Sequence, residues 1–127
     1  MVPVHRILII DDDDDIRELA ALTLEATADW IVYTASCGRD GIDVALEQKP
    51  EAILMDVMMP EMDGPTTFKE MQLIPAIAGI PVVLLTAKVQ GIDQRRFAGL
   101  GVAAVLFKPF DPLTLAAHIS EVLGWQD

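Results

Sequence analysis

The chain has 127 residues, of which 52 % are hydrophobic and 6 % aromatic, and its formal net charge is −11 at pH 7. This size and composition predict one folded domain, 1–127, with an aliphatic core, and they exclude a disordered chain. The negative charge repels nucleic acid phosphates, so we expect no direct nucleic acid contact and an attraction for basic partner surfaces and divalent cations instead.

The sequence lacks the features of an exported or membrane-bound protein. Residues 1–5 do not form the charged start of a secretory signal, and no apolar stretch reaches transmembrane length. The single cysteine, Cys37, excludes an internal disulfide and fits a reducing compartment. We therefore expect a cytoplasmic protein without membrane association, as a monomer or weak dimer.

Short aliphatic runs alternate with helical patterns along the whole chain. In chain order, the patterns predict a strand over 6–10, a helix over 16–27, a strand over 31–33, a helix over 41–49, a strand over 52–55, a helix over 66–73, a strand over 82–85, a helix over 92–98, a strand over 103–107 and a helix over 113–123. Nearly continuous aliphatic strands are typical of parallel strands that are covered on both faces. With right-handed crossovers, these five βα units give a doubly wound α/β sheet.

Polar residues and prolines mark several helix ends. The aspartates at 13–15 stand where the first helix begins, which favours capping and a favourable interaction with the helix dipole. Pro65 fits the first turn of the third helix, and Asp111 followed by Pro112 predicts an N-cap and an N1 proline for the last one. His5 and His118 are predicted to be surface or helix-face residues.

Polar side chains follow four of the predicted strands at the point where each strand ends. Asp11 and Asp12 follow the first strand, Asp56 the third, Thr86 the fourth and Lys108 the fifth. The carboxyl ends of parallel strands share one edge of the sheet, so we expect these side chains to converge. Carboxylates favour Mg²⁺, the hydroxyl and the ammonium suit phosphoryl oxygens, and a carboxylate can itself attack phosphorus to form an acyl phosphate.

Four motifs carry a resemblance to a known family. They are residues 9–13 (IIDDD, with IREL at 16–19), 54–64 (LMDVMMPEMDG), 85–88 (LTAK) and 107–110 (FKPF). In this order and at these separations, the chain resembles a response-regulator receiver domain over essentially its whole length. The resemblance implies a flavodoxin-like (βα)5 fold with strand order 2-1-3-4-5 and Mg²⁺ as the cofactor.

The resemblance also assigns roles to residues of this chain. Asp56 matches the phospho-acceptor. Asp12 matches the carboxylate that binds Mg²⁺ directly, Asp11 the one that acts through metal-bound water, and the backbone carbonyl of Met58 the third protein ligand. Thr86 matches the switch hydroxyl. Lys108 matches the phosphate-binding lysine, whose peptide bond to the following proline is usually cis in the family.

The function implied is that of a phosphorylation switch in two-component or phosphorelay signalling. A histidine kinase or histidine phosphotransfer protein is the expected donor, and the output protein is unknown. The chain would be no enzyme beyond its own phosphorylation and dephosphorylation. Phosphorylation would shift the face made by 92–98, 103–107 and 113–123 between two conformations. The alternative is a receiver fragment of a larger hybrid kinase or multidomain regulator.

Three positions depart from the family pattern. Val105 stands where the family usually has a tyrosine or phenylalanine ring, so the usual coupling through that ring is not expected here. Met58 and Lys88 occupy the two positions thought to tune the lifetime of the phosphoryl group. Neither side chain is a carboxylate or an amide, the groups best suited to orient an attacking water.

Three other functions fit parts of the pattern. A haloacid-dehalogenase-type phosphatase needs Asp-x-Asp-x-Thr/Val after the first strand, but this chain has five aspartates there and no room for a cap. A flavodoxin-like electron carrier needs a hydroxyl- and amide-rich loop at the same place, whereas this loop consists of aspartates. An interaction module with an inactive site is disfavoured because Asp11, Asp12, Asp56, Thr86 and Lys108 are all present.

Overall fold

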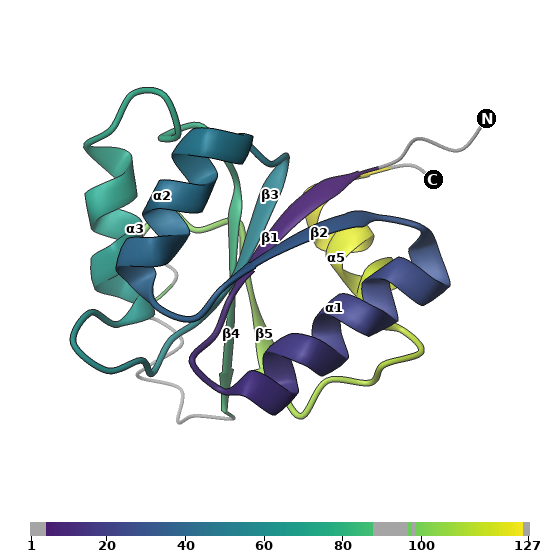
Figure 1. Ribbon diagram of the computed structural model, residues 1–127. Helices are drawn as coiled ribbons and strands as arrows, with labels where there is room; N and C mark the ends of the chain where they lie inside the picture. The colour runs from purple at the N-terminus through teal and green to yellow at the C-terminus, as the bar shows by residue number, and fades with distance from the viewer. Residues whose placement is uncertain (1–4, 88–96, 98, 126–127) are drawn as a thin grey trace.

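The computed structural model describes residues 5–87, 97 and 99–125, and its elements alternate as the sequence predicts (Figure 1). They are β1 (Arg6–Ile10), α1 (Asp14–Ala28), β2 (Ile31–Ala35), α2 (Gly38–Gln48), β3 (Ala52–Asp56), α3 (Gly64–Gln72), β4 (Val82–Ala87), β5 (Ala104–Lys108) and α5 (Leu115–Leu123). The helix predicted over 92–98 lies, apart from Phe97, outside the described residues. Among the described helices, none is both long and apolar enough to cross a bilayer.

The strands form one parallel sheet in the order β2-β1-β3-β4-β5, which confirms the doubly wound fold and the predicted strand order. The register pairs Ile10 with Met55, Asp56 with Leu85, and Thr86 with Phe107. The carboxyl ends of β1, β3, β4 and β5 therefore meet at one edge, and β2 lies at one side of the sheet.

Two layers of helices cover the sheet. Figure 1 shows α2 and α3 on one face and α1 and α5 on the other. Successive strand residues point to opposite faces, so each strand supplies both cores. Leu8 and Ile10 belong to the core under α2 and α3, whereas Ile7 and Ile9 belong to the core under α1 and α5. All four are at most 2 % exposed, which explains why β1 reads as an uninterrupted aliphatic run.

The capping predicted for the start of α1 and the proline predicted for the first turn of α3 are both found in the structure. The side chain of Asp13 accepts hydrogen bonds from the amides of Asp15 and Ile16, which makes Asp13 the N-cap of α1. Asp63 caps α3 in the same way, and Pro65 lies in the first turn of that helix. Both helices therefore begin at the carboxyl edge of the sheet, where the acidic residues lie.

The starts of α2 and α5 differ from the prediction in ways that their caps explain. Helix α2 begins at Gly38, earlier than position 41, because Cys37 is its N-cap and its Sγ accepts the amide hydrogen of Asp40 at 3.4 Å. Helix α5 begins at Leu115, and Asp111 is not its N-cap. The side chain of Asp111 instead accepts the amide hydrogen of Leu113 at 2.9 Å within the turn that precedes the helix.

His5 is buried, which corrects its prediction as a surface residue. It is 8 % exposed, its ring stacks on Trp125 with 3.8 Å between ring centroids, and it meets the edge of Trp30 at 5.6 Å. Its Nδ1 lies 3.0 Å from Oε2 of Glu51. We call His5, Trp30 and Trp125 the aromatic clasp, which joins the start of β1 to the end of α5. His118, on α5, is exposed as predicted.

Candidate functional site

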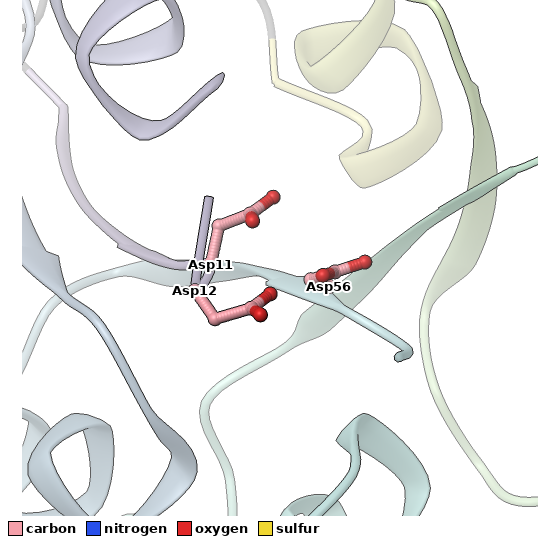
Figure 2. Close-up of side chains that lie close together, drawn as sticks. All are labelled: Asp11, Asp12 and Asp56. Carbon is pink, nitrogen blue, oxygen red and sulfur yellow. The ribbon is translucent and has the colours of Figure 1, made fainter. Parts of the chain in front are cut away.

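The acidic residues converge where β1 and β3 end. Asp11 and Asp12 follow β1 directly, and Asp56 is the last residue of β3. Figure 2 shows the three side chains side by side, and one ligand oxygen from each lies within 4.8 Å of those of the other two. Asp11 and Asp56 are buried at 1 % and 6 % exposure, while Asp12 is exposed. We call these three aspartates the acidic pocket.

Lys108 brings a positive charge to the pocket from the end of β5. Its Nζ donates a hydrogen bond to Oδ1 of Asp56 at 3.1 Å and lies 3.1 Å from Oδ2 of Asp11. The peptide bond between Lys108 and Pro109 is cis, as the resemblance implies. Thr86 lies at the neighbouring end of β4 and is 2 % exposed. The structure thus gathers the predicted carboxylates and lysine, with the threonine on the adjacent strand.

The environment of Asp56 disfavours its negative charge. Burial and the nearby charge of Asp11 raise the pKa of Asp56 from 3.8 to about 6, against the opposing effect of Lys108. The pKa of Lys108 is raised as well: burial lowers it, but the hydrogen bond to Asp56 and the negative charges of Asp11 and Asp56 outweigh burial. The lysine therefore stays charged while Asp56 titrates within reach of neutral pH.

The acidic pocket has an oxygen atom and excess negative charge available to bind a cation. Asp11 Oδ1 accepts the amide hydrogen of Asp13 at 2.9 Å, but Asp11 Oδ2 is buried and makes no hydrogen bond among the described residues. The ammonium of Lys108 offsets the negative charge of Asp11, but it leaves Oδ2 of Asp11 without a hydrogen bond. Three carboxylates facing one ammonium leave a negative excess, and an all-oxygen donor set suits a hard divalent ion such as Mg²⁺. The residues present therefore fit the expected cofactor.

Three of the predicted positions carry less structural detail. Met58 lies two residues after Asp56, in the segment between β3 and α3, and its side chain is 76 % exposed, so any ligand from it has to be the backbone. Val105 is partly buried against the core under α2 and α3 and contributes no ring there. Lys88 lies outside the described residues.

The sequence analysis assigned no role at the site to Arg17 and Gly64, although both lie within the quoted motifs. Arg17 Nη1 donates to the carbonyl oxygen of Asp11 at 2.8 Å and so holds the end of β1. Gly64 begins α3 so close to Asp56 that a Cβ on it would lie 2.5 Å from the carbonyl oxygen of Asp56. A glycine before a proline predicts only a helix start, and an arginine on α1 only a surface charge, so neither contact has a signal in the sequence.

The comparisons with known proteins agree with this geometry. Residues 7–120 match the response regulator receiver domain family. The chain is 36 % identical to the DNA-binding dual master transcriptional regulator RpaA of Synechocystis, over 96 % of this chain and 50 % of RpaA. It is 32 % identical to the alkaline phosphatase synthesis transcriptional regulatory protein PhoP of Bacillus subtilis, over 93 % of this chain and 48 % of PhoP. The chain thus spans about half the length of these curated relatives.

Solved structures give the same result for the fold. The chemotaxis protein CheY4 of Vibrio cholerae is similar with a TM-score of 0.86 and 28 % identity, over 94 % of this chain and 99 % of CheY4. A response regulator from Chloroflexus aurantiacus gives a TM-score of 0.86 at 30 % identity, over 96 % and 99 % of the two chains. Sequence, fold and family match therefore agree that this chain belongs to the response regulator receiver domains of two-component signalling.

Proposed function

We propose that the chain is a cytoplasmic phospho-accepting receiver domain, 1–127, that takes a phosphoryl group onto Asp56 from a histidine kinase or a histidine phosphotransfer protein. The observation that carries the proposal is the setting of Asp56, a buried carboxyl with a raised pKa that lies beside Asp11 and 3.1 Å from the ammonium of Lys108. Perturbed titratable groups of this kind are typical of reactive sites.

The chain's own residues account for the transfer. Lys108 holds Oδ1 of Asp56, so we assign Oδ2 as the oxygen that attacks phosphorus while the phosphorus–nitrogen bond of the donor breaks. The leaving imidazole nitrogen takes up a proton. Lys108 offsets the charge on the phosphoryl oxygens, and we assign the hydroxyl of Thr86 as a donor to one of them.

Mg²⁺ would be held by Asp12 and Asp56, by the backbone carbonyl of Met58, and by Asp11 through water. When bound, the ion supplies positive charge that offsets the charge of the carboxylates and of the phosphoryl group. The exposed carboxylate of Asp12 and the spare oxygen of Asp11 support this assignment. The only reactions assigned to the chain are its own phosphorylation and dephosphorylation.

The output is proposed to be a population shift on the face that carries β5 and α5, read by an unknown protein. RpaA is a DNA-binding regulator, and this chain matches half of it. For this chain, we propose no direct nucleic acid contact, because a net charge of −11 repels phosphates.

The test is phosphorylation by a small phosphodonor. With acetyl phosphate and Mg²⁺, the intact mass should increase by one phosphoryl group, and Asp56→Asn should abolish this increase because an amide is not a nucleophile at phosphorus. Asp15→Asn is the matched control, since Asp15 is an exposed aspartate on the first turn of α1, and it should be labelled normally. Full labelling of Asp56→Asn would contradict the assignment.

A further inference from the structure

The outer edge of β2 carries unpaired backbone groups. Among the described strands, β2 pairs with β1 alone. Towards β1, the amide of Ile31 donates to the carbonyl of His5 at 2.9 Å and the carbonyl of Ala35 accepts from the amide of Asp11 at 3.1 Å. In a parallel ladder the residues between such partners direct their N–H and C=O groups to the other side. Val32 and Thr34 therefore face outward, where the described residues supply no further strand.

A groove follows this edge. One hollow of about 460 Å³ lies between β2 and α1, with Ala21, Leu22 and Val32 among its lining residues. A second of about 410 Å³ lies between the end of β2 and α2. Both are lined by Arg17 and Thr34, so the two hollows adjoin each other, and together we call them the edge groove. Figure 1 shows β2 between α1 and α2, with its outer side uncovered by a drawn strand or helix.

The walls of the edge groove are acidic. Glu18 and Glu25 line the α1 side, Asp40 and Asp43 line the α2 side, and all four are exposed. Arg17 is the one cation among the lining residues, and it is already engaged with the carbonyl of Asp11 and the carboxylate of Asp14. A second copy of this chain would bring the same four carboxylates to the contact, and like charges repel. The complementary occupant is a basic one.

We propose that the outer edge of β2 docks an extended, lysine- or arginine-rich segment of a partner protein, which pairs beside β2 as an added strand. The backbone groups of Val32 and Thr34 provide the ladder bonds. The alternating side chains of the segment reach the α1 wall on one side and the α2 wall on the other. Leu22, 64 % exposed, offers apolar surface to the residues between the charges. The site needs neither Asp56 nor a bound cation.

The test uses a labelled peptide about eight residues long, within the length of ordinary strands, that repeats Lys-Lys-Val-Val so that lysines point towards both walls. Fluorescence anisotropy measures its affinity for the full chain. A second peptide has the same sequence but carries N-methyl groups on all of its backbone amides, so its charge is unchanged and neither of its edges can donate ladder bonds. We expect at least tenfold weaker binding of the methylated peptide, and amide shift changes at Val32 and Thr34 with the parent peptide.

Two sets of variants locate the contact. Thr34→Pro removes the outward N–H at an edge position, where proline is tolerated, and should weaken binding about tenfold. Because proline can also disturb β2, the double variant Glu25→Gln/Asp43→Asn tests the acidic walls without touching the backbone. Its matched control, Glu47→Gln/Glu70→Gln, removes the same charge from exposed positions outside the groove. The wall variant should bind several times more weakly, and the control should bind as the parent chain does.

Three results would overturn the proposal. Equal affinity for the methylated and the unmethylated peptide would show charge attraction without strand pairing. Equal loss in the wall variant and its control would show binding to the overall negative field. A dimer of the free chain in sedimentation experiments, dispersed by Thr34→Pro, would show that a second copy takes the edge instead.

Discussion

Asp56 combines burial with a like charge at close range. It is 6 % exposed and Asp11 is 1 % exposed, and among the described residues Lys108 is the cation within ion-pair distance of both. Folding at neutral pH therefore places two buried carboxylates against one ammonium. This excess negative charge destabilises the folded state until a cation binds or a carboxylate takes up a proton.

Stability should consequently depend on pH through Asp56. A carboxyl whose pKa is higher in the folded state, here raised from 3.8 to about 6 chiefly by burial, binds its proton more tightly when folded. Without Mg²⁺, this group's contribution to the free energy of unfolding should be fully present below pH 3.8 and be lost as the pH rises through about 6. At about 1.4 kcal/mol per unit, its ceiling is about 3 kcal/mol.

Urea unfolding at a series of pH values in chelator measures this contribution. Asp56→Asn is neutral at every pH, so the difference in stability between the variant and the parent should favour the variant near pH 7 and shrink as the pH approaches 4. A difference that stays constant over this range would assign the pH dependence to other groups.

The response to Mg²⁺ should depend on Asp12. Mg²⁺ that binds the folded state alone raises the melting temperature. Asp12→Ala should remove most of this increase, and it should leave the ion-free form as stable as before or more so, because a carboxylate of the acidic pocket is gone. Asp15→Ala, in the first turn of α1, is the control and should keep the full response. An unchanged response in Asp12→Ala would rule out Asp12 as a ligand.

At the scale of the elements, the segment between β3 and α3 decides where the acceptor lies. The amide of Gly64 donates to the carbonyl of Val57 at 2.8 Å, and Asp63 caps the helix that follows. The start of α3 thereby lies directly against the end of β3. A side chain at position 64 would meet the backbone of Asp56 and Val57, which has no flexible end to move away.

Gly64→Ala should therefore destabilise the fold and disturb the acceptor together. Its Cβ would lie 2.5 Å from the carbonyl oxygen of Asp56. Overpacking of this kind costs about 1–3 kcal/mol. Gly79→Ala is the matched control, because a Cβ there meets no atom within 4 Å. Urea unfolding and acetyl phosphate labelling should both be impaired in Gly64→Ala alone. Equal stability of the two variants would contradict the close approach.

The order of the elements could be read from the sequence because four of the five strands end abruptly in a polar residue. Ile10 is followed by Asp11, and Met55 by Asp56, so the aliphatic runs locate the sheet and the polar residues locate its functional edge. The candidate pocket follows from parallel topology alone. Its finer contacts do not, since the 3.1 Å pairing of Lys108 with two carboxylates joins residues far apart in the sequence.

Helix starts were less predictable because the residues found there, such as glycine or aspartate before proline, are compatible with more than one local structure. Gly41 reads as a breaker, yet it lies inside α2, where a Cβ would come within 2.3 Å of Ile10 Cδ1, so close packing explains this glycine. Cysteine is an unusual N-cap, and Cys37 therefore gave no warning of the earlier start. Aspartate followed by proline is compatible with a helix N-cap and also with a turn. Asp111 and Pro112 form a turn.

At the scale of the molecule, β1 connects two sites that lie at the two ends of this strand. Its carboxyl end leads into the acidic pocket, and its amino end leads back to His5 and the aromatic clasp. Five residues at about 3.3 Å each separate these ends by about 16 Å. The clasp also brings the residue before the first strand into contact with the residues after the last described helix, which are far apart in the sequence.

Trp125→Ala should weaken the whole fold. The variant loses the stack on His5 and the edge contact with Trp30, whose ring centroid lies 5.3 Å away. Two aromatic contacts at about 0.5–1.5 kcal/mol each predict a loss of about 1–3 kcal/mol in the free energy of unfolding. Leu113→Ala is the control, because Leu113 is 84 % exposed and should change stability little. Equal effects of the two substitutions in urea unfolding would mean that the clasp contributes nothing.

The clasp has a further consequence for spectroscopy. The chain contains two tryptophans, and both belong to the clasp. Ultraviolet emission therefore reports on one place, the junction of β1 with the end of α5, about a strand's length from Asp56. An emission change on adding Mg²⁺ or a phosphodonor would have to be relayed through the sheet, and a silent signal would not mean an empty pocket. Direct optical detection of the pocket requires a chromophore placed there, for example a tryptophan at the exposed position of Met58.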